Sequence, residues 1–245
     1  MKFVTPLLLM WLQTSIFGMI DLLIISNFTD TNAIDAVAGG ISVMNIVIYS
    51  IAALTSGGGI LIGQALGAKR DADVKKIIGN MFVLFAIIGI GITILMLSLS
   101  GAIISWLNLT GPASEDGFNY LIIASAGIPF IMGFNVIAAQ LRAFGNSRSP
   151  FLFLILAAVI NIALDLLFVG LFGMRTTGAA LASIISQMIS FSAAVIYLRV
   201  KNYPVHIAKK DIRLDKEYAA KTLKTGLPLA LQDCIVLLSF TIIMA

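Results

Sequence analysis

The sequence has little charge and almost none of the side chains on which enzymes rely. Of its 245 residues only 11% are charged, against roughly 25% in soluble domains. Cys234 is the only cysteine, which excludes a disulfide framework or a thiolate metal site built from this chain alone. His206 is the only histidine, and no nucleophile elbow, phosphate loop or metal-spaced cluster lies near it. We therefore expect neither an enzyme nor an organic cofactor.

Apolar residues make up 59% of the chain and occur in long, nearly uncharged runs. Each run is about long enough to cross ~30 Å of hydrocarbon as a helix, so the sequence predicts an all-α, multi-pass membrane protein. The predicted helices are Val4–Ser26, Ala36–Leu66, Val74–Leu99, Phe118–Leu141, Phe151–Phe172, Gly178–Leu198 and Leu223–Ala245. We read residues 1–198 as a six-helix lobe, 199–222 as a basic linker, and 223–245 as the first helix of a second lobe.

The basic residues indicate topology rather than a nucleic-acid partner, although the formal net charge is +4. Fifteen of the sixteen Lys and Arg residues lie at the N-terminus or in the second, fourth and sixth connections between predicted helices, and Arg175 alone lies in an alternate connection. Lys and Arg are retained on the cytoplasmic side of membranes. The pattern predicts a cytoplasmic-membrane protein whose N-terminus and basic linker face the cytoplasm.

Two carboxylates are predicted to lie at membrane depth. Asp21 follows Pro6, and Asp165 follows Pro150, by fifteen residues each, and both helices enter from the predicted cytoplasmic side. At 1.5 Å per residue each carboxylate lies ~22 Å beyond its proline, so we expect the two to share one cavity in the outer half of the membrane. Asn161 precedes Asp165 by one turn and lies on the same helix face.

Other polar side chains are predicted to reach the same depth. Ser183 and Gln187 lie on a helix that enters from outside, and Tyr120 lies near the outer start of its helix. An ionised Asp at the centre of a spanning helix costs about 2.5 to 3.5 kcal/mol on insertion scales. One reading is structural, with each Asp paired to neighbouring amides and hydroxyls. The functional reading is a cation site, because oxygen ligands suit Na⁺ and burial favours protonation of a carboxylate.

A glycine pattern in the second predicted helix suggests close helix packing. The stretch GILIGQALG places Gly59, Gly63 and Gly67 at four-residue spacing, which lets helix backbones approach in lipid. Gly57 and Gly58, just before it, are candidates for a bend.

Four stretches, taken in order and spacing, resemble the multidrug and toxic compound extrusion (MATE) antiporters. They are FGMIDLLIISNF, GQALGAKRDADVKK, LRAFGNSRSP and NIALDLLFVGLFGMRTTGAALAS. The chain is similar to the N-terminal half of such a protein plus the first helix of the second half, in the DNA-damage-inducible-like prokaryotic branch. The resemblance implies half of a two-lobe, inverted-V transporter that is monomeric when full length. It implies export of cationic or amphipathic drugs and toxins in exchange for Na⁺ or H⁺.

The resemblance also implies roles for individual residues. Asp21, Asn161, Asp165 and Ser183 match the cation-coupling positions, with Na⁺ expected at Asp21, Asn161 and Asp165. The remaining matches are substrate-cavity positions (Tyr120, Asn135, Gln187 and Phe17, the last in place of a tyrosine) and a helix bend at Pro6. The second lobe is missing after its first helix, so we expect a fragment or a truncated reading frame.

Two rival functions remain open. A lipid-linked precursor flippase of the same superfamily would need a strongly basic cavity, and we predict no Lys or Arg within the helices. A non-transporting membrane scaffold would carry its intramembrane carboxylates for structural reasons only.

Overall fold

The fold is a bundle of long helices. The computed structural model describes residues 20, 22–29, 31–201 and 211–244, and all regular structure within these ranges is helical. Residues 22–28 form a helical segment. The helices that follow are α2 (Thr31–Gly67), α3 (Asp71–Trp106), α4 (Pro112–Ala126), α5 (Ile128–Ala143), α6 (Arg148–Asp165), the π-helix η1 (Leu166–Leu171), α7 (Arg175–Val200) and α8 (Lys216–Met244). The predicted all-α class is confirmed.

The lengths of the described helices fit a membrane. Four segments are long and apolar enough to span it, namely 34–67, 71–106, 148–171 and 175–200. A fifth span is the pair α4 and α5, bent by 43°. Pro129 lies in the first turn of α5 and has no N–H to continue the ladder from α4, which accounts for the bend. The first predicted run lies mostly outside the described residues, and the seventh lies in α8.

Large apolar side chains on the outside of the bundle are consistent with lipid contact. On α3, Ile87, Ile90, Ile94 and Leu95 are all exposed. The interior instead contains tightly packed side chains such as Phe85 of α3 and Ile51 of α2, both fully buried. A bundle with an apolar exterior is expected where lipid, rather than water, is the solvent.

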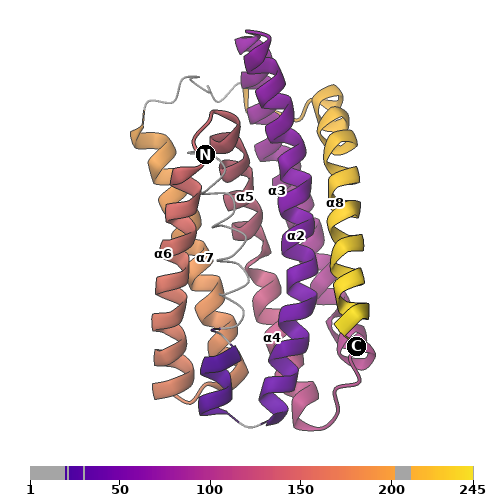
Figure 1. Ribbon diagram of the computed structural model, residues 1–245, viewed down its shortest axis with the longest axis vertical. Helices are drawn as coiled ribbons and strands as arrows, with labels where there is room; N and C mark the ends of the chain where they lie inside the picture. Colours follow the sequence, from indigo (N-terminus) through magenta and orange to yellow (C-terminus); the bar gives the residue numbers. More distant parts are fainter. Residues whose placement is uncertain (1–19, 21, 30, 202–210, 245) are drawn as a thin grey trace.

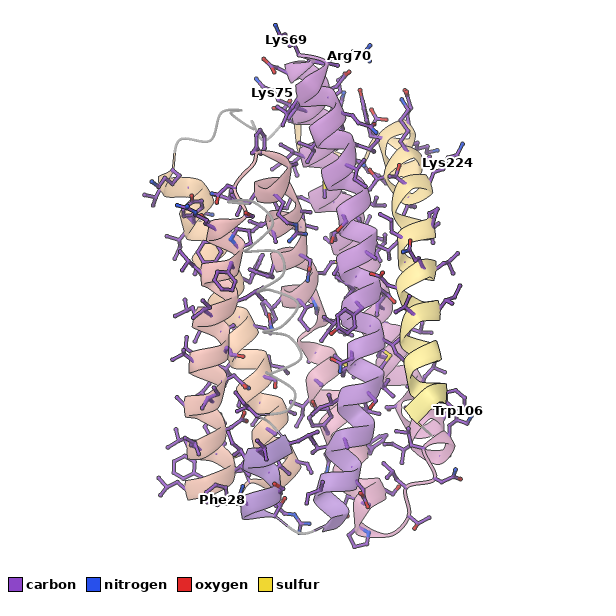
Figure 2. The ribbon with its side chains drawn as sticks, in the orientation of Figure 1. Phe28, Lys69, Arg70, Lys75, Trp106 and Lys224 are labelled. Atoms are coloured by element: carbon purple, nitrogen blue, oxygen red, sulfur yellow. The ribbon has the colours of Figure 1, made fainter. Side chains whose placement is uncertain are left out.

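Helix α2 is the long central element, in contact with α3, α4, α5 and α8 (Figure 1). The pair α6 and α7 lies on the far side of the bundle from α8 (Figure 1). Figure 2 shows Lys69, Arg70, Lys75 and Lys224 gathered towards one end of the bundle, while Phe28 and Trp106 lie towards the other.

The prediction of close packing at the α2 glycines is confirmed for Gly59, where a Cβ would lie 3.1 Å from the carbonyl oxygen of Ala139 in α5, but it is wrong for Gly63 and Gly67 and misses Gly57. A Cβ on Gly57 would lie 2.5 Å from the backbone nitrogen of Gly226 in α8, and a Cβ on Gly226 would lie 2.5 Å from the carbonyl oxygen of Leu54. By contrast, a Cβ on Gly63 or Gly67 would meet nothing within 4 Å. The α2 helix also continues through Gly57 without a break. Spacing alone does not reveal which face of a helix meets a neighbour.

The start of α8 is anchored on α3. The helix begins at Lys216, seven residues before the predicted start of the last run and inside the predicted linker. The N–H of Asp215 donates to Oδ1 of Asn80 at 2.9 Å, and the hydroxyl of Tyr218 donates to Oδ1 of Asp73 at 2.8 Å. This hydrogen bond, together with burial and nearby carboxylates, raises the pKa of Tyr218 to about 12. The division into lobe and linker stays a prediction.

Candidate ion and substrate site

The end of α6 places two predicted site residues inside the bundle. Asn161 is fully buried and Asp165 is 1% exposed. They are four residues apart in a continuous α-helix, so both side chains lie on the same face. Asp165 is the last residue of α6, and the chain continues directly as the π-helix η1. Short π-helical segments inside longer helices are frequent at functional sites.

Helix α7 supplies the third member of this set. The side-chain amide of Asn161 donates to the hydroxyl of Ser183 at 3.4 Å, a long hydrogen bond that joins α6 to α7. The structure therefore brings Asn161 and Ser183 together, with Asp165 one turn from Asn161. Oxygen atoms from a carboxylate, an amide and a hydroxyl are ligands suited to Na⁺ or to a shared proton.

A cavity of about 220 Å³ lies beside this set, lined by residues of α2, α4, α5, α6 and α7. Four predicted site residues line it: Tyr120, Asn135, Ser183 and Gln187. Asn161 and Asp165 are not among its lining residues, so Ser183 is the residue that connects the polar set to the cavity. The predicted cavity positions and the predicted coupling positions are therefore neighbours rather than one site.

Local packing fixes two of the cavity side chains. The ring of Tyr120 rests against Gly40 of α2, where any Cβ would approach the ring to 2.4 Å. The amide of Asn135 donates to the carbonyl of Ile131, one turn earlier in α5, at 2.9 Å. This bond uses the amide group of Asn135 and leaves its side-chain carbonyl oxygen available as a hydrogen-bond acceptor.

Three predicted residues lie outside the described residues: Asp21, Phe17 and Pro6. The meeting of Asp21 with Asp165 therefore stays a prediction, as does the helix bend at Pro6.

One cavity residue was missed from the sequence. We placed Arg142 in a connection, but α5 extends to Ala143 and Arg142 lines the cavity. The prediction that the helices contain no Lys or Arg is therefore wrong. The missed signal is spacing, because Arg142 follows Asn135 by seven residues, which is two helical turns.

An ion pair joins the start of α7 to α4. Arg175, at the start of α7, lies 3.2 Å from Oδ2 of Asp116 in α4. The hydroxyl of Thr176 donates to Oδ1 of the same carboxylate at 3.2 Å. The single basic residue predicted for the outer side is thus neutralised by a neighbouring acid.

A group of three or more His, Cys, Asp or Glu side chains able to hold a metal is not found among the described residues. The candidate ion ligands are a carboxylate, an amide and a hydroxyl, which is a weak set for transition metals and a suitable one for Na⁺.

A buried polar set enclosed by lipid-facing helices is the architecture of one lobe of a membrane transporter. The chain belongs to the MatE family, whose family model matches residues 6–167. The probable multidrug resistance protein YoeA of Bacillus subtilis is 30% identical over 244 residues, covering 97% of this chain and 53% of that protein. The multidrug export protein MepA of Staphylococcus aureus is 26% identical over 243 residues, covering 98% and 53%.

Solved structures agree with this assignment. A multidrug resistance MATE family transporter in its inward-facing conformation matches with a TM-score of 0.85 and 26% identity, over 92% of this chain and 51% of that one. An outward-facing MATE transporter matches with a TM-score of 0.88 and 25% identity, over 99% and 53%. The chain spans about half the length of the curated relatives it matches. The lobe fold is similar in both conformations, and the MATE resemblance of the sequence is confirmed.

Proposed function

We propose that this chain forms the first lobe of a secondary active transporter that exports cationic or amphipathic drugs and toxins in exchange for Na⁺ or H⁺. The observation that carries the proposal is the buried pair Asn161 and Asp165 on α6, which the hydrogen bond from Asn161 joins to the half-buried Ser183 of α7. The names of the similar proteins, which describe multidrug resistance and export, support the substrate class.

The energetics of Asp165 support an ion-coupled role. A carboxylate at membrane depth is costly when ionised, and uptake of Na⁺ or a proton removes that cost. An ion can shift the balance between inward-open and outward-open states only by binding one of them more tightly. Asn161 donates to Ser183 and lies one turn from Asp165, so ion binding at this pair would reorient a side chain that also lines the cavity. Binding of the ion and binding of the exported compound would thereby be coupled through the hydroxyl group of Ser183.

The distribution of charge supports an orientation. Lys69, Arg70 and Lys75 project from the end of the bundle where α2 and α3 meet, and Lys224 lies towards the same end (Figure 2). We infer that this end faces the cytoplasm and that the N-terminus lies on the same side.

The test is ion binding by the purified chain with and without the carboxylate. Asp165→Asn keeps the size of the side chain and removes its charge, and we expect it to abolish saturable ²²Na⁺ binding or the matching proton uptake. Asp35→Asn is the control, because Asp35 is an exposed carboxylate at the start of α2. Equal binding by the wild type and Asp165→Asn, measured by equilibrium dialysis across pH 5 to 9, would contradict the proposal.

In cells, the same substitution is expected to abolish drug export by the transporter that contains this lobe while its membrane level stays unchanged. Undiminished drug resistance in Asp165→Asn cells would remove the coupling mechanism. A purely structural role of Asp165 predicts the opposite combination, a lowered membrane level with normal export per molecule.

A further inference from the structure

Arg142 is the only charged residue among the described residues that line the lobe cavity. The other polar lining residues are uncharged, and Asp165 does not belong to the lining. A cavity that only had to accept cations would be hindered by a guanidinium group, which stays protonated in proteins. The presence of Arg142 therefore needs an explanation beyond the proposed export of cations.

The side chain of Arg142 is not required to cap the C-terminal end of α5. The last carbonyls of α5 are satisfied by the backbone: the N–H of Phe144 donates to Gln140, that of Gly145 to Arg142, and that of Asn146 to Leu141. Gly145 makes this turn possible, because its φ of +81° is favourable only for glycine. A guanidinium group is therefore not needed as a cap.

The connection from α5 to α6 is also held together without Arg142. The side-chain carbonyl of Asn146 accepts the N–H of Ser149 at 3.1 Å, and its amide donates to the hydroxyl of Tyr197 at 3.0 Å. These bonds tie the connection to α7. Within the described part of the chain, Arg142 forms no ion pair with a carboxylate. The guanidinium group is thus not committed to a carboxylate of the described residues, and it lines the cavity.

We propose that Arg142 binds the acidic group of an amphipathic organic anion or zwitterion, which makes the lobe cavity selective for compounds that carry a carboxylate, sulfonate or phosphate on an aromatic or apolar body. This inference rests on the proposed export function and narrows its substrate class. A planar guanidinium group forms two parallel hydrogen bonds to such a group, and it does so more strongly where water is excluded.

The other lining residues fit the rest of such a compound. Phe134 and Leu154 supply apolar surface to the same lining, while Asn135 and Gln187 supply hydrogen-bonding groups. The volume of about 220 Å³ is below the roughly 300 to 1,000 Å³ of sites that enclose a whole drug-sized molecule. The lobe cavity therefore accepts the acidic end of the compound, and the remainder extends out of the cavity.

The experiment compares one dye in two charge states. A rhodamine as its ethyl ester is a cation, and the same rhodamine as its free acid is a zwitterion of nearly identical shape. Binding of each to the purified 245-residue chain in neutral detergent is measured by fluorescence anisotropy. We expect the wild type to bind the free acid at least tenfold more tightly than the ester.

Substitutions assign this preference to Arg142. Arg142→Gln is expected to weaken binding of the free acid by about ten- to hundredfold, the loss typical of a hydrogen bond to a charged group, and to leave the ester unchanged or tighter. Arg142→Lys keeps the charge and is expected to keep the preference for the acid. Arg148→Gln is the control, since Arg148 is an exposed cation six residues away that does not line the cavity.

Anionic lipid headgroups offer the same chemistry as an exported acid, so the titrations are repeated in nanodiscs with and without phosphatidylglycerol. Competition by phosphatidylglycerol that Arg142→Gln abolishes supports the acidic-group site and identifies lipid as an occupant. Absence of competition, with the dye preference intact, supports an exported acid.

Three results would overturn the inference: tighter binding of the ester by the wild type, equal effects of Arg142→Gln on both dyes, or no binding of the free acid. The first and third need no variant and stand even if Arg142→Gln does not fold. None of these results bears on ion binding at Asp165, so failure of the inference and failure of the proposed antiport are distinguishable.

Discussion

Two helix pairs in this lobe are held together by different means. The pair α2 and α8 meets backbone to backbone, with Gly57 against Gly226 and no room for a Cβ. The pair α6 and α7 meets through side-chain hydrogen bonds: the amide of Asn161 donates to Ser183, and the hydroxyl of Ser190 donates to the carbonyl of Phe153 at 3.0 Å. Both solutions suit lipid, where apolar side chains gain little by leaving one apolar environment for another.

The difference corresponds to the roles that we propose for the two pairs. Polar contacts between α6 and α7 bring together oxygen atoms that the proposed ion site needs. Close packing between α2 and α8 instead brings two backbones together at Gly57 and Gly226, which suits the boundary that we predict between the first lobe and the first helix of a second. The polar contacts of α6 with α7 and the backbone contact of α2 with α8 thus lie on opposite sides of the bundle (Figure 1).

The strongest test of this comparison is to enlarge a glycine at the close contact. Gly57→Val places methyl groups against the backbone of α8, which has no flexible side chain to move aside. We expect the free energy of unfolding to fall by about 1 to 3 kcal/mol, as for other overpacked sites. Gly63→Val on the same helix is the control, since a Cβ there meets nothing within 4 Å. Equal thermal destabilisation of the two variants in detergent would show that the glycine contact does not hold α8.

A smaller effect is expected at the polar pair. Ser190→Ala removes the hydrogen bond from α7 to the carbonyl of Phe153 in α6. Interhelical hydrogen bonds in membranes contribute about 0.6 kcal/mol on average, so we expect a loss of this size in the free energy of unfolding. Ser192→Ala, at an exposed position two residues along α7, is expected to be neutral. A loss at Ser190 as large as that of Gly57→Val would remove the distinction between the two pairs.

The smallest effect is expected at the N-terminal end of α8 and adds a third kind of helix contact to the comparison. There the hydroxyl of Tyr218 donates to Asp73, which raises the pKa of Tyr218 to about 12. Asp73→Asn removes the carboxylate, and we expect the pKa of Tyr218 to fall towards its usual value near 10. The measurement is ultraviolet absorbance of tyrosinate during a pH titration, with Tyr218→Phe identifying the signal.

The sign of the pH dependence follows from the raised pKa. The folded state favours neutral Tyr218, so its contribution to stability is complete below pH 10 and is lost as the pH rises through about 12. The contact is therefore expected to be constant across the physiological range. Loss of the contact between pH 6 and 8 would contradict this assignment.

Hydropathy predicted most of the spans but not where the helices end. Runs of apolar residues mark the part of a helix that lies in lipid, whereas the ends are set by hydrogen bonds and charged side chains. Thus α8 begins at Lys216 because Asp215 accepts the N–H of Glu217 at 3.0 Å and Glu217 pairs with Lys221 at 2.6 Å. Both features lie in a charged stretch that a hydropathy window reads as a linker.

The candidate site was also predictable only in part. Helical spacing placed Asn161 and Asp165 on one face, and orientation brought Ser183 to their level, which the structure bears out for Asn161 and Ser183. The rotation of each helix about its axis is not contained in such counting. Counting therefore suggests a bend at Gly57, where the structure has a close contact with α8. Arg142 lies just past the predicted end of its helix, so its place in the cavity depends on where α5 ends.

Cys234, at the contact between α8 and α2, gives the chain a practical advantage. Its sulfur lies 3.2 Å from the hydroxyl of Ser50, and no second thiol occurs in the sequence. A nitroxide or fluorophore attached to this thiol would therefore report on the separation of α8 from α2 without any background labelling. Within this chain the thiol is thus a single attachment point for spectroscopy at the contact between α8 and α2.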